Sequence, residues 1–151
     1  MVEIGDRNGS EDLMAAILVD TGILYAMADI DDAWHEPVKT FLQNTTDALV
    51  VPITVLPEIC YLLNTHLSQE SEKKLIASIT QGELRIEGLT NEDFRRSVQL
   101  LETYSDVNIG FVDASLVAIA ERLKISRILT TDRKHFSIIR PRHCHSFVLL
   151  P

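Results

Sequence analysis

The feature that most constrains the fold is a short apolar run, residues 16–19, which stops directly on a carboxylate, Asp20. A run of this length favours a strand buried on both faces, as in a parallel sheet. Residues 21–28 then carry apolar side chains at helical spacing, so we expect a helix to follow the strand at once. Because ligands of open α/β sheets bind beyond the carboxyl ends of the strands, this corner also predicts where a site would lie.

The rest of the chain alternates short apolar runs with helical patterns. We expect further strands over residues 48–51, 84–87, 127–130 and 147–150. Helices are expected over residues 33–44, 54–66, 68–80 and 92–104, and from Asp113 to about residue 123. This order of elements predicts an α/β fold of three layers with a mainly parallel central sheet.

The length of 151 residues suits one ordinary domain, and no linker or internal repeat divides residues 15–151. The polar residues 1–14 are expected to form a flexible N-terminal tail. No apolar run approaches the ~20 residues of a membrane span, and no basic region followed by an apolar one opens the chain. Together with two cysteines in apolar surroundings, these features predict a cytoplasmic protein with no membrane partner.

Four acidic residues occupy the same kind of position, at the end of a strand or at the start of a helix. They are Asp20, Glu58, Asp113 and Asp132. In a parallel sheet such positions converge on one edge, and Mg²⁺ or Mn²⁺ needs this convergence of hard oxygen ligands. Each acid alone has a simpler explanation, because an acid in the first turn of a helix is stabilised by the free N–H groups there. Glu58, however, lies in an otherwise apolar stretch, where burying an ion without a partner would be costly.

Four segments in sequence order resemble the successive motifs of PIN-domain proteins, above all VapC-type ribonuclease toxins and their stand-alone relatives. The segments are Ile17-Leu18-Val19-Asp20-Thr21, the helix start between Pro52 and Glu58, Phe111-Val112-Asp113-Ala114-Ser115-Leu116-Val117-Ala118, and Leu129-Thr130-Thr131-Asp132-Arg133-Lys134-His135-Phe136. The resemblance covers about residues 16–150, nearly the whole chain. It implies a single PIN-like α/β/α sandwich over residues 15–151. It also implies an endoribonuclease that uses Mg²⁺ or Mn²⁺ to hydrolyse RNA phosphodiester bonds.

The resemblance further implies roles for single residues and for partners. By position, four residues match the catalytic and metal-binding acids of the family: Asp20, Glu58, Asp113 and Asp132. The last of these matches an acid that is often closer to a second metal or to a water. Thr21 and Thr131 match the small hydroxyl residues beside the acids. The family commonly forms homodimers, and its toxin members are held inactive by an antitoxin protein.

The distribution of charge adds a second candidate feature. The formal net charge is −8, which by itself argues against a nucleic-acid partner. No acid follows Asp132, however, and the last 19 residues carry four basic side chains. These are Arg133, Lys134, Arg140 and Arg142. A basic edge beside an acidic body can hold the phosphate backbone of an RNA substrate, and a solvated basic tail is the alternative.

Other interpretations of the same residues stay open or are disfavoured by particular positions. A PIN domain that acts mainly as a protein or RNA interaction module, without activity of its own, is the alternative function. A haloacid-dehalogenase-like phosphatase needs a second Asp two positions after the first, where this chain has Gly22. The run His143-Cys144-His145 has no further ligand pair nearby to complete a zinc site. His35 lies on a polar helix face and is expected at the surface.

Overall fold

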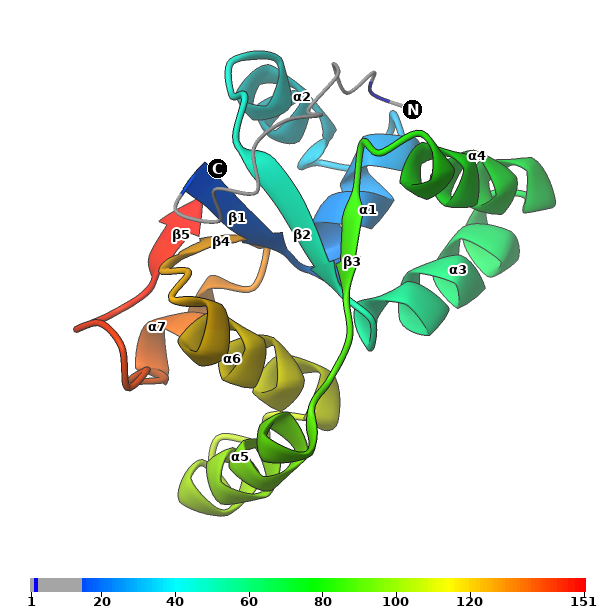
Figure 1. The fold of residues 1–151 in the computed structure, drawn as a ribbon. Helices are drawn as coiled ribbons and strands as arrows, with labels where there is room; N and C mark the ends of the chain where they lie inside the picture. The colour runs from blue at the N-terminus through cyan, green and yellow to red at the C-terminus, as the bar shows by residue number, and fades with distance from the viewer. Residues whose placement is uncertain (1, 3–14) are drawn as a thin grey trace.

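The computed structural model describes Val2 and residues 15–151, so the tail predicted for residues 1–14 lies outside the described residues apart from Val2. The described strands are β1 (Ala16–Val19), β2 (Ala48–Pro52), β3 (Arg85–Glu87), β4 (Arg127–Leu129) and β5 (Val148–Leu150). The described helices are α1 (Thr21–Ala28), α2 (His35–Gln43), α3 (Val55–His66), α4 (Gln69–Thr80), α5 (Asn91–Thr103), α6 (Phe111–Leu123) and α7 (Arg133–Ile138) (Figure 1). None of these helices is long and apolar enough to cross a membrane.

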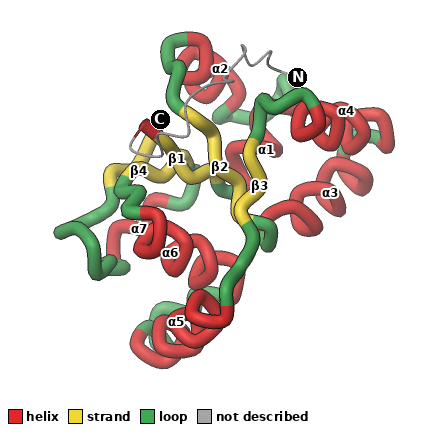
Figure 2. Tube along the Cα trace, viewed as in Figure 1, coloured by secondary structure: helices red, strands yellow, loops and turns green. Residues whose placement is uncertain are grey.

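The five described strands form one sheet in the order β3-β2-β1-β4-β5, and every neighbouring pair is parallel. β1 lies at the centre, with Ile17 aligned to Leu49 of β2 and Leu18 aligned to Ile128 of β4. Helices cover both faces of the sheet, with α1–α4 on one side and α5–α7 on the other (Figure 2). The prediction of a three-layer α/β fold is confirmed, and the sheet is parallel throughout the described residues.

The central strand explains the two-sided core. All of β1 is buried, because its side chains point alternately toward the two helical layers. Ile17 and Val19 pack in the core beneath α1–α4, whereas Ala16 and Leu18 pack in the core beneath α5–α7. A continuous apolar run therefore marks this strand in the sequence. A strand with one solvent-exposed face would instead alternate apolar and polar residues.

Two helix ends have the capping residues that their sequence favours, and a third end does not. Thr90 and Asp93 form a reciprocal capping box at the start of α5. Gly82 follows α4 with a φ of 79°, a backbone conformation that glycine adopts without strain. Thr54 stands at the N-cap position of α3, but its hydroxyl hydrogen-bonds to the hydroxyl of Ser115 at 2.6 Å and does not cap the helix.

Three expectations about elements and burial are wrong. The pattern does not predict α7, because a helix of only six residues is too short to show a periodicity. α6 begins at Phe111 and not at Asp113, since Gly110 at its N-cap has no side chain to mark the start. His35 is only 6% exposed, and its ring N–H at Nδ1 donates to the carbonyl of Ala26 at 2.6 Å. This bond ties the first turn of α2 to α1.

Candidate active site

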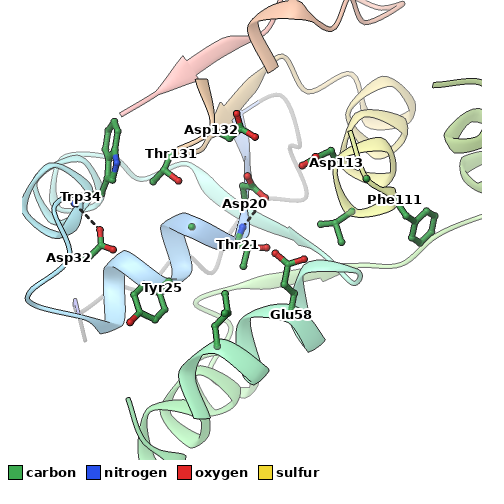
Figure 3. Close-up of a pocket in the computed structure, with 14 residues that line it drawn as sticks. Asp20, Thr21, Tyr25, Asp32, Trp34, Glu58, Phe111, Asp113, Thr131 and Asp132 are labelled. Carbon is green, nitrogen blue, oxygen red and sulfur yellow. Dashed lines mark hydrogen bonds between the residues drawn. The ribbon is translucent and has the colours of Figure 1, made fainter. Parts of the chain in front are cut away.

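A cavity of about 560 Å³ opens beyond the carboxyl end of β1, between α1, α3 and the start of α6 (Figure 3). Its lining includes the four acids that the sequence singles out: Asp20, Glu58, Asp113 and Asp132. The first follows β1, the second stands on α3, the third on α6, and the fourth caps α7. The parallel sheet thus brings to one place acids that lie far apart along the chain.

Asp20 is the most buried of these acids, only 8% exposed. One carboxylate oxygen accepts the backbone N–H of Thr21 at 2.8 Å, and the other accepts the hydroxyl of Thr130 at 2.9 Å. Burial raises the pKa of Asp20 to about 6; the two hydrogen bonds oppose this rise, and the charges of Asp113 and Asp132 add to it. The cavity therefore makes the ionised form of Asp20 less favourable than it is in water, a penalty that a bound positive charge would offset.

Asp113, Asp132 and His135 form a compact group at the cavity. One potential ligand atom from each lies within 4.8 Å of the other two, whereas Asp20 and Glu58 are outside this group. As the cap of α7, Asp132 accepts the backbone N–H of His135 at 3.0 Å, and its second oxygen lies 2.7 Å from Nδ1 of the same histidine. Burial raises the pKa of Asp113, and the charges of Asp132 and Glu58 act in the same direction. The acids therefore repel one another across the cavity.

Glu58 does not have the buried environment that its apolar sequence neighbours suggest. Its side chain is exposed and lies toward the other acids from the first turn of α3 (Figure 3). The buried residues of α3 are Val55, Ile59 and Leu63. Because these residues share one helical face, the apolar stretch is divided between the core and the surface, and Glu58 is on the surface side.

Two neighbours of Asp20 shape the wall of the cavity. Thr21 is only 6% exposed, and its hydroxyl has no hydrogen-bond partner among the described residues. Gly22 packs so closely against Thr131 that an added Cβ would collide with the threonine hydroxyl. Both threonines that the sequence match indicated therefore line the cavity, and Gly22 is needed there for space.

Thr130 is a residue that the sequence match missed. Its hydroxyl donates to Asp20 and accepts the backbone N–H of Asp132 at 2.9 Å, so it connects two of the acids. Thr130 directly follows β4 and is fully buried. His135 was missed as well, although its spacing of three residues after Asp132 is the spacing of a capping pair.

The comparison with known families agrees with this geometry. Residues 17–140 match the family model of the PIN domain. The chain belongs to the PIN-domain family. Ribonuclease VapC26 of Mycobacterium tuberculosis is 30% identical over 135 residues, which cover 89% of this chain and the whole of that protein.

Solved structures of VapC toxins and toxin–antitoxin complexes share the PIN fold. VapC20 of M. tuberculosis, described as a sarcin-ricin loop cleaving toxin, matches with a TM-score of 0.73 and 23% identity, over 78% of this chain and 91% of that one. A toxin–antitoxin complex from Klebsiella pneumoniae matches with a TM-score of 0.64 and 19% identity, over 82% and 92% of the two chains. VapBC2 of Rickettsia felis, bound to a DNA fragment from its promoter, matches with a TM-score of 0.61 and 16% identity, over 89% of this chain and 96% of that one. At these identities the structures show a shared fold.

The basic residues proposed to contact RNA are absent from the described lining of the cavity. The Arg133 guanidinium lies over the ring of Trp34, 5.7 Å from its centre, and donates to the backbone carbonyl of Leu149. Arg140 and Arg142 hydrogen-bond to groups on α7 and α5. Three of the four cations thus contact other parts of the PIN domain, and an RNA-binding role for these residues stays a prediction.

The cavity has a further lining that the sequence did not mark as functional. It includes one more acid and three aromatic residues: Asp32, Tyr25, Trp34 and Phe111. In the sequence, Asp32 has the features of a helix cap and Trp34 those of an apolar helix face. Only the fold of the PIN domain shows that these side chains border the acids.

Proposed function

We propose that this PIN domain is a metal-dependent endoribonuclease, of the kind found as the toxin of a toxin–antitoxin pair. The observation that carries the proposal is the cavity into which Asp20, Glu58, Asp113 and Asp132 converge. The similarity to ribonuclease VapC26 over its whole length supports RNA as the substrate class. The likeness of the fold to toxin–antitoxin complexes supports an antitoxin as a partner. From the family resemblance we also propose that the protein is a homodimer in the cytoplasm.

The residues at the cavity fit a divalent cation. Burial and mutual repulsion raise the pKa of Asp20 and of Asp113, and a bound cation would remove both penalties. Carboxylate oxygens are the ligands that Mg²⁺ and Mn²⁺ prefer. From the motif positions of the family we assign Asp20, Glu58 and Asp113 to hold the ion, with Asp132 beside it; of these acids, Asp113 and Asp132 stand with His135 in the compact group. The buried hydroxyl of Thr21 has no partner among the described residues, so it is free to bind a ligand in the cavity.

The chemistry would follow from these groups. A bound Mg²⁺ or Mn²⁺ supplies Lewis acidity toward the phosphoryl group and lowers the pKa of the attacking water. Asp132 orients that water, and the contact with His135 holds the carboxylate of Asp132 in place. The Thr21 hydroxyl donates to a non-bridging phosphate oxygen. Attack of water on phosphorus then breaks the bond to the 3′ oxygen and leaves a 5′-phosphate and a 3′-hydroxyl.

The test is cleavage of RNA by the isolated chain with Mg²⁺ or Mn²⁺, compared with the same reaction in EDTA. Asp113→Asn should abolish cleavage while circular dichroism shows an unchanged fold. Asp106→Asn is the matched control, because Asp106 is an exposed acid outside the cavity lining. Cleavage that persists in EDTA or in the Asp113 variant would contradict the proposal. A chain that binds RNA or a partner protein but never cleaves would favour the interaction module.

A further inference from the structure

The acids of the cavity are flanked at both ends by aromatic rings. Trp34 lies at one end, at the start of α2, and Phe111 lies at the other, at the start of α6 (Figure 3). The labelled acids Asp20, Asp113 and Asp132 lie between these two rings. A chain that crosses the acids would therefore meet an aromatic side chain before and after them.

Phe111 is part of an exposed stacked pair. Its ring centre is 5.9 Å from that of Phe94 on α5, and the two ring planes differ by only 10°. Phe111 is 40% exposed and Phe94 is 49% exposed, so a substantial part of each residue remains in contact with water. Phe111 stands two residues before Asp113 at the start of α6, and its ring points away from Asp113 toward Phe94 of α5, so this aromatic surface continues outward from the edge of the cavity (Figure 3).

Trp34 presents the second ring. The Arg133 guanidinium occupies one side of the indole at 5.7 Å from its centre. The backbone N–H of Trp34 donates to Asp32 at 2.8 Å, which fixes the start of α2 at the cavity. Trp34 lines the cavity and is partly exposed, so its ring is accessible from the cavity side.

The charge of the cavity favours a contribution of these rings to RNA binding. None of the described lining residues carries a positive charge, and the whole chain has a net charge of −8. Apart from the proposed divalent cation, the lining therefore offers no positive side chain to neutralise phosphates, although such neutralisation dominates the affinity of most nucleic-acid-binding proteins. Stacking of bases on aromatic rings needs no cation and tolerates any base sequence.

We propose that Phe111, supported by Phe94, and Trp34 are base-stacking subsites on either side of the cleaved phosphate. The proposal rests on the proposed function, and it assigns the side chains on which unstacked bases of the RNA substrate would lie. A continuous duplex hides the faces of its bases in the helix stack, so it cannot occupy these rings without being opened.

The test measures the affinity of the full-length chain for a labelled RNA hexamer by fluorescence anisotropy in EDTA, where metal-dependent cleavage is absent. Phe111→Ala should weaken binding about 5- to 150-fold, the range expected for the loss of one stacked base. Phe111→Leu keeps apolar bulk without the ring and should weaken binding nearly as much. Tyr61→Ala is the matched control, since Tyr61 is an aromatic residue 68% exposed outside the cavity lining, and it should bind as the wild type.

A second measurement uses the fluorescence of Trp34, the only tryptophan in the chain. Titration with the single strand should quench this emission, and the matched duplex should leave it unchanged at the same concentration. Equal affinity for single strand and duplex, or wild-type affinity of both Phe111 variants, would overturn the proposal. The proposal would also be overturned if Phe94→Ala changed the oligomeric state, measured by light scattering, without changing the RNA affinity. The Phe94–Phe111 pair would then be a contact between copies of the chain.

The outcomes separate this inference from the proposed function. A wild-type chain that cleaves RNA, with an unchanged KM in Phe111→Leu, would leave the ribonuclease in place and remove the stacking subsites. A chain that never cleaves RNA, but binds single strands less tightly when Phe111 is replaced, would keep the stacking subsites and remove the ribonuclease. If neither form of RNA binds, in EDTA or to Asp113→Asn with Mn²⁺, the stacking proposal is wrong.

Discussion

Two regions of the molecule hold partly buried acids, and they are built in opposite ways. Between α5 and α6, Asp93 is 3% exposed and accepts from Nε of Arg122 at 3.0 Å, and Glu121 pairs with Arg96 at 2.7 Å. In the cavity, no acid among the described residues has an arginine or lysine within ion-pair distance. The first region is an ion-paired support of the fold, and the second is a cluster of acids without an arginine or lysine partner, in which His135 contacts Asp132.

The pKa directions follow from this difference. Burial tends to raise the pKa of Glu121, but hydrogen bonds and charges from Arg96 and Arg142 outweigh it, and the pKa lies below its ordinary value. For Asp20 and Asp113 nothing outweighs burial, and the pKa lies above its ordinary value. Burial of an acid therefore does not mark a site by itself. The absence of an arginine or lysine partner is what distinguishes the cavity.

The largest contrast between the regions is expected in catalysis. Asp20→Asn should lower the rate of Mn²⁺-dependent RNA cleavage by roughly 100-fold or more, because it removes a proposed metal ligand. Glu121→Gln should leave the rate unchanged, since that acid lies outside the cavity lining. Initial rates at saturating RNA check this, with circular dichroism to verify folding. Equal losses in the two variants would erase the functional distinction between the regions.

The second contrast is expected in stability. Arg122→Ala should lower the free energy of unfolding by about 2–4 kcal/mol, because it leaves Asp93 buried without its partner. Arg95→Ala should change it by less than about 0.5 kcal/mol, since Arg95 pairs with Glu92 on the exposed face of α5. Urea denaturation in EDTA measures both. A similar loss in the two variants would contradict the role of Arg122 as a buried support.

The third contrast concerns pH. The pKa of Asp20 is about 6 in the folded state against 3.8 for the ordinary group, so the folded state binds this proton more tightly. The resulting stabilisation is complete below pH 3.8 and is lost as the pH rises through about 6, which amounts to about 3 kcal/mol. Urea denaturation in EDTA should therefore show a steeper decline between pH 4 and 7 for the wild type than for Asp20→Asn. Parallel curves would contradict the burial of an uncompensated charge at Asp20.

The smallest effect is expected at the basic end of the chain. Arg140→Glu should weaken RNA binding only a few-fold and reduce the slope of log affinity against log salt by about one, as for a single phosphate contact. Anisotropy titrations at several salt concentrations measure this. Unchanged affinity and slope would assign Arg140 to a solvated basic tail.

Much of the architecture of this PIN domain is present in local sequence. The apolar run before Asp20 predicts a strand buried on both faces, and the spacing of Thr90 and Asp93 predicts a capping box. Such signals work because strand burial and helix capping depend on residues only a few positions apart. The convergence of the four acids was also predictable, since parallel strands all end at one edge of the sheet.

The tertiary structure decided which groups meet once the elements had packed. Thr130 bonds an acid 110 positions away in the chain, and Phe94 stacks on a ring from another helix. Glu58 is exposed despite its apolar neighbours, because only one face of α3 is buried. The sequence by itself determined that Asp20 closes a central strand beside a helix. The packing of distant elements determined that Asp20 is buried without a counter-charge, because burial and charge pairing are set by contacts between elements and not by spacing within them.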